Sequence, residues 1–202
     1  MKKYVMLMVC LAVMTFCNDL HAETLEVFTD WIRSCESENL TKLEIFYRIN
    51  NYQLTFEAAD AGHFQANLTL QLKIADKDGN VLAEQSFPRK VFAQNRQETM
   101  NQQQFLLDKE IIDLPKGEYR IAFSVRDEIS GANFSEERAI TTLSIDEFCM
   151  SDISLASYIG IDTTANSALK IIPNPTAKYG QSFPILYYYY EVYNVPQDKE
   201  NF

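Results

Sequence analysis

Alternation of apolar and polar residues with a period of two is the feature that most constrains the fold of this chain. It is unbroken from 65 to 74, where one side carries Ala66, Leu68, Leu70, Leu72 and Ile74, and the other Gln65, Asn67, Thr69, Gln71 and Lys73. Because successive side chains of a β-strand point to opposite faces, the segment predicts a strand with one buried and one wet face. Helical apolar periodicity nowhere extends beyond a turn or two.

Similar segments recur along the chain, and turn-forming residues separate them. Asp76 to Asn80 contains Gly79 and predicts a tight hairpin turn, and further turn signals follow at 115–117 and 127–131. The expected strands are Thr41–Ile49, Gln53–Glu57, Gln65–Lys73, Val81–Phe87, Phe105–Leu114, Tyr119–Val125 and Phe134–Ile145. Together they predict an all-β fold, an immunoglobulin-like antiparallel β-sandwich over residues 41–146.

The string Leu114-Pro115-Lys116-Gly117-Glu118-Tyr119 resembles the tyrosine corner of immunoglobulin-like sandwiches. In that corner a tyrosine near the start of a late strand bonds its hydroxyl back to upstream backbone. We therefore expect a structural role for Tyr119.

The amino terminus has the features of an export signal. Lys2 and Lys3 precede thirteen uncharged, mostly apolar residues, Tyr4 to Phe16, a stretch too short to span a bilayer as a helix. We expect residues 1–22 to be a signal peptide cleaved after Ala22, which places the mature chain in the periplasm or outside the cell. Lipidation at Cys17 would attach it to a membrane instead, but Phe16 stands where a small residue is needed, so soluble export is favoured.

The rest of the chain divides by composition. Residues 23–40 are expected to be a lead-in to the sandwich, and 147–183 an ordered connector or a short helix near Ser151 to Tyr158, rather than strands. Residues 184–202 carry an aromatic segment that includes Tyr187, Tyr188, Tyr189, Tyr190 and Tyr193. Since it is apolar or aromatic on both faces, we expect a strand that either adds to the sandwich or opens a second, incomplete one.

Two cysteines remain after signal cleavage, Cys35 and Cys149. An even pair in an exported chain is compatible with a disulfide, and two separate thiols are the alternative. Their separation excludes a CxxC redox or zinc site.

Charge and titratable residues exclude several classes of function. The net charge of −10 and the 18 dispersed Lys and Arg residues offer no surface for nucleic acid. His63 is the single histidine of the mature chain and sits in a turn-like segment, and Asp76, Asp78 and Asn80 imitate the start of a calcium loop without its bidentate glutamate. We therefore expect no enzyme and no catalytic, cofactor-binding or metal-binding residue.

Several strings resemble the amino-terminal part of the bacterial GWxTD-domain proteins. They are Leu43 to Ile49, the corner at 114–119, Met150 to Ala156, Ile172 to Pro175 with Tyr179-Gly180, and Pro184 to Val195. The Gly-Trp-x-Thr-Asp signature itself is absent. The resemblance implies export and β-modules, in a chain that is either the front part of a longer multi-domain protein or a stand-alone unit.

These observations favour a non-catalytic cell-envelope module that binds a protein partner, or a second copy of itself, through a sheet edge. The tyrosine segment at Tyr187 to Tyr190 and Tyr193 is the expected interaction strand, acting by β-augmentation. The alternative is a carbohydrate-binding sandwich that uses Tyr187, Tyr189 and Tyr193 as an exposed aromatic platform.

Overall fold

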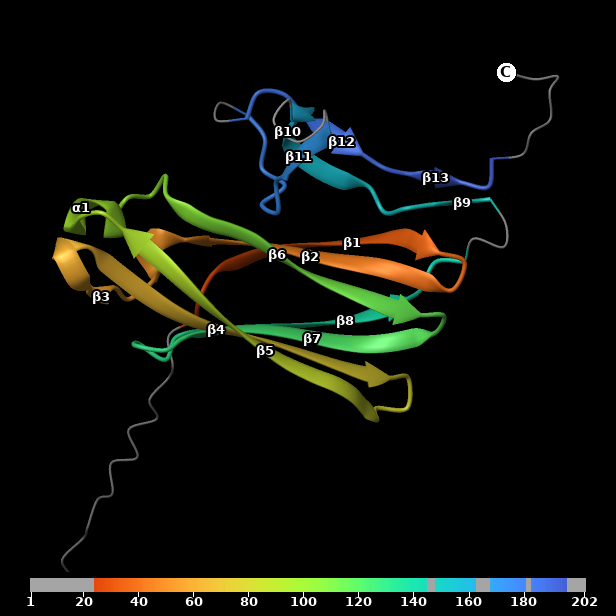
Figure 1. Cartoon of the computed structure of the whole chain (residues 1–202), viewed down its shortest axis with the longest axis horizontal. Coiled ribbons are helices and arrows are strands. Elements are labelled where there is room, and N and C mark those ends of the chain that lie inside the picture. The colour runs from red at the N-terminus through yellow and green to blue at the C-terminus, as the bar shows by residue number, and fades with distance from the viewer. Residues whose placement is uncertain (1–23, 145–147, 163–167, 181–182, 196–202) are drawn as a thin grey trace, which may run out of the picture.

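The computed structural model describes residues 24–144, 148–162, 168–180 and 183–195. The expected signal peptide, with Cys17 and Ala22, lies outside these residues. The fold is all-β, and its antiparallel sheets lie in three layers (Figure 1). Helix α1 (Arg96–Thr99) is a single turn, and no helix in the described ranges is long and apolar enough to cross a membrane.

The first two layers form the predicted immunoglobulin-like sandwich. The middle sheet has the order β1-β2-β6, from strands Val27–Ser37, Leu40–Asn50 and Phe105–Pro115. In the sheet that faces it, β4 (Phe64–Asp76) pairs with β5 (Val81–Ala93) along one edge, and with β7 (Glu118–Asp127) and the short β3 (Glu57–Ala58) along the other. Strand β8 (Asn133–Thr141) lies beyond β7.

Alternating residues of both sheets fill the core between them. On β2 they are Leu43, Ile45, Tyr47 and Ile49, and they meet Leu68, Leu70 and Leu72 of β4 and Ile121, Phe123 and Val125 of β7, all essentially without exposure. The rings of Tyr47 and Phe123 pack with centroids 5.5 Å apart. Since each large apolar side chain contributes roughly 1.5–3 kcal/mol when fully buried, this core supplies the main stabilisation of the sandwich.

Residues 23–40 do not form the predicted lead-in, because most of them belong to strand β1. It pairs with β2 from Val27 opposite Ile49 to Ser37 opposite Leu40. The adjacent residues Trp31 and Ile32 are both buried, one on each face of the sheet. This two-sided burial hides the simple alternation by which the other strands were predicted.

A polar cluster joins the two sheets where β5 and β6 approach each other. The guanidinium of Arg89 on β5 pairs with Asp108 at 2.9 Å and Glu110 at 2.7 Å on β6. The Tyr47 hydroxyl donates to Asp108 at 3.2 Å. Burial raises the pKa of Glu110 above its usual value, although the positive charge of Arg89 acts to lower it. Each charged group of the cluster therefore has an oppositely charged partner within it.

The two predicted turn features have clear backbone roles. The Asp76 carboxylate accepts from the backbone N–H groups of Asp78 and Asn80, both at 2.9 Å, and Gly79 takes a φ of 87° in the β4–β5 hairpin. The Tyr119 hydroxyl donates to the Pro115 carbonyl at 2.8 Å, which is the contact expected of a tyrosine corner.

The third layer, which we call the cap, is formed by described residues between 148 and 195. It contains a sheet of order β11-β10-β12, from Ala168–Pro173, Ser154–Asp162 and Tyr187–Tyr189, and a two-stranded pair of β9 (Cys149–Met150) with β13 (Val192–Tyr193). The prediction of a connector or a short helix, rather than strands, over 147–183 is therefore wrong. A register shift between Ala156 and Tyr158 breaks the period of two in β10, which conceals the strand in the sequence. The tyrosine strand β12 does not add to the sandwich but pairs with β10 of the cap.

The expected strand Gln53–Glu57 is replaced by a turn of 3-10 helix at Asn51–Gln53 and an extended loop. Asp127, which is fully buried, holds this loop. Its carboxylate accepts from the backbone N–H groups of Thr55 at 2.7 Å, Ile129 at 2.9 Å and Ser130 at 3.2 Å. The three hydrogen bonds connect the loop that contains Thr55 to the turn between β7 and β8.

We expect Asp127→Asn to destabilise the protein by about 2 kcal/mol, because the amide turns one acceptor into a donor facing backbone N–H groups. Urea denaturation followed by circular dichroism measures this loss. Glu128→Gln, at the exposed neighbouring position, is the matched control and should leave the midpoint unchanged. Equal stability of the two variants would contradict the role given to Asp127.

Candidate functional site

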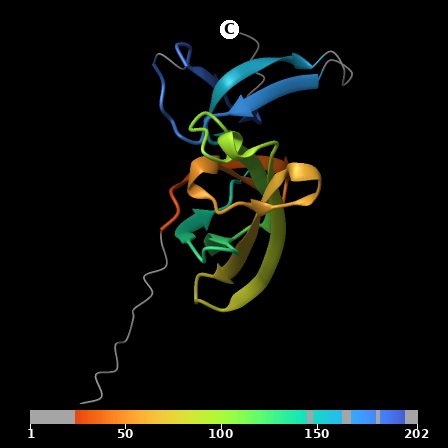
Figure 2. The same cartoon turned by 90° about the vertical axis from the view of Figure 1, so that its left-hand side faces the viewer.

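Figure 2 shows the cap stacked on the middle sheet. A cleft of about 500 Å³ lies between these two layers. The middle sheet contributes Ile32, Phe46 and Leu107 from its outer face, and the cap contributes Leu169, Ile171 and Pro173. Phe46 is the residue that interrupts the alternation of β2. It is apolar because it faces the cap rather than solvent.

The charged groups that line this cleft are paired within the chain. Lys109 forms an ion pair with Glu44, and Asp152 pairs with Arg33. Glu191 accepts from the hydroxyls of Tyr189, at 2.8 Å, and Tyr193. What the cleft offers to another molecule is therefore mainly its apolar surface.

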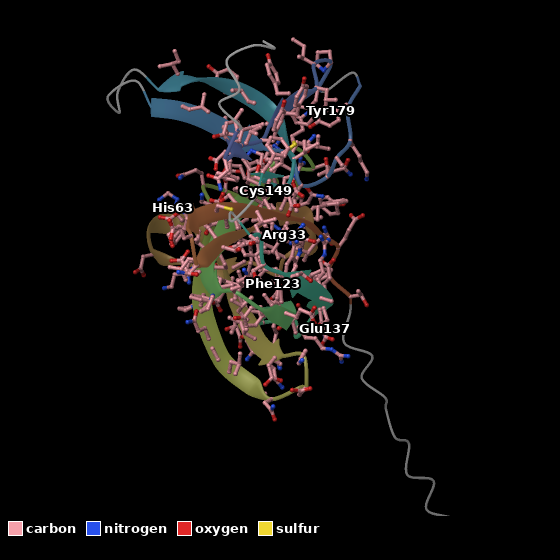
Figure 3. The ribbon with its side chains drawn as sticks, turned by 90° about the vertical axis from the view of Figure 1, so that its right-hand side faces the viewer. Arg33, His63, Phe123, Glu137, Cys149 and Tyr179 are labelled. Carbon is pink, nitrogen blue, oxygen red and sulfur yellow. The ribbon has the colours of Figure 1, made fainter. Side chains whose placement is uncertain are left out.

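Arg33 and Asp152 form the polar joint between sandwich and cap. Figure 3 labels Arg33, which belongs to the middle sheet, and Cys149, which belongs to the cap. The guanidinium donates to both carboxylate oxygens at 2.8 Å, and the Arg33 backbone N–H donates to the same carboxylate at 2.9 Å. The Asp152 backbone N–H in turn donates to the Arg33 carbonyl at 2.9 Å. Burial alone would raise the pKa of Asp152, but the bonds and charge of Arg33 outweigh it and hold that pKa below its usual value.

Cys35 and Cys149 are free thiols on either side of this junction. Tyr193 lies opposite Cys149 in the β9–β13 pair, and its hydroxyl accepts from the Cys35 backbone N–H at 3.0 Å. Burial, followed by the neighbouring Cys149 and Glu191, raises the pKa of Cys35 to about 11. The two residues are thus brought together, and whether oxidation joins them stays a prediction.

The tyrosines of the expected interaction strand divide between two environments. Tyr187 and Tyr189 pair with the buried residues Ala156 and Ser154 and are half-buried, as is Tyr193. Tyr188 and Tyr190 are 60% and 41% exposed, and their rings are parallel within 6° at a centroid distance of 6.3 Å. The platform of Tyr187, Tyr189 and Tyr193 expected for carbohydrate binding is therefore not exposed.

The other sequence candidates lie away from the cap. His63 lines a small cavity with Asp60 and Phe92, and its Nδ1 is buried without a hydrogen-bond partner. Within the described ranges, no group of three or more His, Cys, Asp or Glu side chains is placed to hold a metal ion.

Large apolar side chains are exposed throughout the cap, and Ala156 and Pro175 are its buried apolar residues among those described. The exposed residues are Phe148, Met150, Ile153, Tyr158, Ile161, Leu169, Ile185, Leu186, Tyr188, Tyr190, Val192 and Val195. The tyrosines among them stand out in the sequence, whereas Ile161 and Leu169 do not, because their segment has the composition of a connector.

No protein-family model and no curated protein matches this chain.

We expect Asp152→Asn to lower the free energy of unfolding by about 1 kcal/mol at neutral pH, because it removes a part-exposed charged partner of Arg33. Since the folded pKa of Asp152 lies below its unfolded value of about 4, the advantage of the native carboxylate is complete above that pH and disappears as pH falls through the folded pKa. Urea titrations between neutral and acid pH measure the difference between the proteins. The exposed Asp78→Asn is the control, and a difference that persists in strong acid would contradict this account.

We expect Cys35 to be alkylated slowly in the folded protein, because with a pKa of about 11 it carries about a hundredfold less thiolate near pH 8 than an ordinary thiol. Iodoacetamide labelling with peptide mass mapping measures the rate at increasing pH, and the urea-denatured chain is the control. Equal rates in folded and denatured protein at pH 8 would show that the thiol is not shielded.

Proposed function

We propose that this chain is an exported, non-catalytic module of the cell envelope that binds a protein partner through its cap. Export rests on the signal-like segment 1–22, and the link to GWxTD-domain proteins rests on the strings described above. The single observation that carries the binding proposal is the exposure of large apolar side chains throughout the cap, while the sandwich keeps its own buried core. A high density of exposed large apolar side chains in one layer is typical of interaction sites.

The backbone of the cap supports binding by strand addition. In the described sheet β11-β10-β12, strands β11 and β12 stand at the two ends, so each has one edge that pairs with no described strand. Such edges present backbone N–H and C=O groups to an extended partner segment. Tyr188 belongs to β12, so it lies next to the free edge of that strand and supplies apolar contact area.

We expect Tyr188→Asp to raise solubility and to reduce association, because a carboxylate in a desolvated apolar contact has no compensating charge. Multi-angle light scattering over a range of protein concentrations measures self-association, and the increase in fluorescence of an apolar dye measures the exposed surface. Tyr52→Asp is the matched control, since Tyr52 is a 41% exposed tyrosine of the sandwich. Unchanged association and dye binding in the Tyr188 variant would count against the cap as the binding surface.

Carbohydrate binding is the second candidate, favoured by one observation. Tyr188 and Tyr190 are exposed, and their rings are nearly parallel, which suits stacking on a sugar ring. Affinity electrophoresis in gels that contain soluble glycans distinguishes the two candidates. Retardation that disappears in Tyr190→Ala supports the sugar platform, whereas equal mobility with and without glycan removes it.

A further inference from the structure

A second, smaller cavity of about 290 Å³ lies where the loop after β11 meets the outer face of the middle sheet. Phe28, Arg48 and Asn50 of the sheet line one side, and Thr176, Lys178 and Tyr179 of the cap line the other. The register of the sheet places Phe28 directly opposite Arg48. The Tyr179 hydroxyl donates to the Ala156 carbonyl at 3.2 Å, which fixes this loop to β10.

Aromatic rings, rather than carboxylates, hold the two cations of this cavity. The Arg48 guanidinium carbon lies 3.8 Å from the centroid of the Phe105 ring, and Lys178 Nζ lies 4.8 Å from the centroid of Phe28. A cation–π contact positions a cation but leaves its net charge uncompensated. None of the described residues that line the cavity is acidic.

The hydrogen bonds of Arg48 do not neutralise its positive charge either. Its Nη2 donates to the neutral Asn50 Oδ1 at 3.3 Å, and its Nε is buried without a partner. Three other arginines of the structure, Arg33, Arg89 and Arg138, each pair with a carboxylate at 2.7–2.9 Å. In a chain with 28 acidic and 18 basic residues, a pocket with two cations and no acid is a local reversal of the overall charge.

We propose that this cavity binds a compact anionic group, a phosphate or a carboxylate, between the Arg48 guanidinium and the Lys178 ammonium group. The planar guanidinium suits two-point contact with such oxygens, and the lysine adds a second, adaptable positive charge. Its volume is close to the lower limit of about 300 Å³ for small-molecule sites, which favours a small anion or the anionic end of a larger ligand. This site is independent of the proposed partner binding, which uses the exposed side of the cap.

The test is a titration of the full chain with inorganic phosphate and, separately, with acetate, at constant ionic strength maintained with sodium chloride. Amide chemical shifts in two-dimensional NMR spectra report the site and the affinity. We expect saturable shifts confined to the neighbourhood of Asn50 and Lys178. Saturation by phosphate alone identifies a phosphoryl ligand, and saturation by acetate alone identifies a carboxylate.

Two variants connect the binding to the proposed cations. Lys178→Gln and Arg48→Gln should each weaken it about tenfold or more, because each removes one charge-assisted contact. Lys170→Gln, which removes an exposed lysine elsewhere in the cap, is the matched control and should leave the affinity unchanged. Since Lys178 is exposed, its variant remains informative even if the Arg48 variant fails to fold.

Three results would overturn the proposal. They are the absence of saturable shifts with both anions, shifts spread over the whole surface, and an equal loss of affinity in the Lys170 and Lys178 variants. The last two would show general charge screening rather than a site.

Discussion

Burial of the middle sheet on both faces is the constraint on which the rest of the structure depends. Its inner face, with Leu43, Ile45 and Tyr47, forms half of the sandwich core, and its outer face, with Ile32, Phe46 and Leu107, lies under the cap. A sheet enclosed in this way needs apolar residues on both sides, whereas the facing sheet keeps one side in water. The cleft and the cationic cavity both lie in the space that the cap leaves over this outer face.

The attachment of the cap is more polar than the packing inside the sandwich. At one contact point the Asp152 backbone N–H donates to the Arg33 carbonyl, and the Asp152 carboxylate accepts from the Arg33 backbone N–H and from its guanidinium. The ring of Phe28 beneath Lys178 provides another contact point. Directional bonds of this kind fix an orientation while burying little apolar area. The cap therefore keeps exposed the large apolar side chains that a second sheet packed on it would bury.

Sequence alone predicts the strands in which apolar and polar residues alternate, and it fails where this alternation is broken. The regular pattern of β4 gave its position correctly, and the string before Tyr119 gave the corner. Strand β1 was missed because Trp31 and Ile32 are buried on opposite faces, and β10 because its register shifts after Ala156. The cationic cavity has no linear signature, since Phe28, Arg48 and Lys178 meet only through strand register and the return of the chain from the cap.

The two edge strands of the sheet that faces the middle sheet differ from the tyrosine strand of the cap in one further respect. Strand β5 pairs with β4 alone among the described strands and carries Pro88 at its centre, while the outer strand β8 carries Glu136, Glu137 and Arg138 in succession. Proline lacks the amide proton that a neighbouring strand would need, and consecutive charges resist desolvation, so both edges oppose sheet extension from one molecule to the next. The tyrosine strand β12 carries neither a proline nor a charged side chain, so its outer edge lacks both of these obstacles to an added strand.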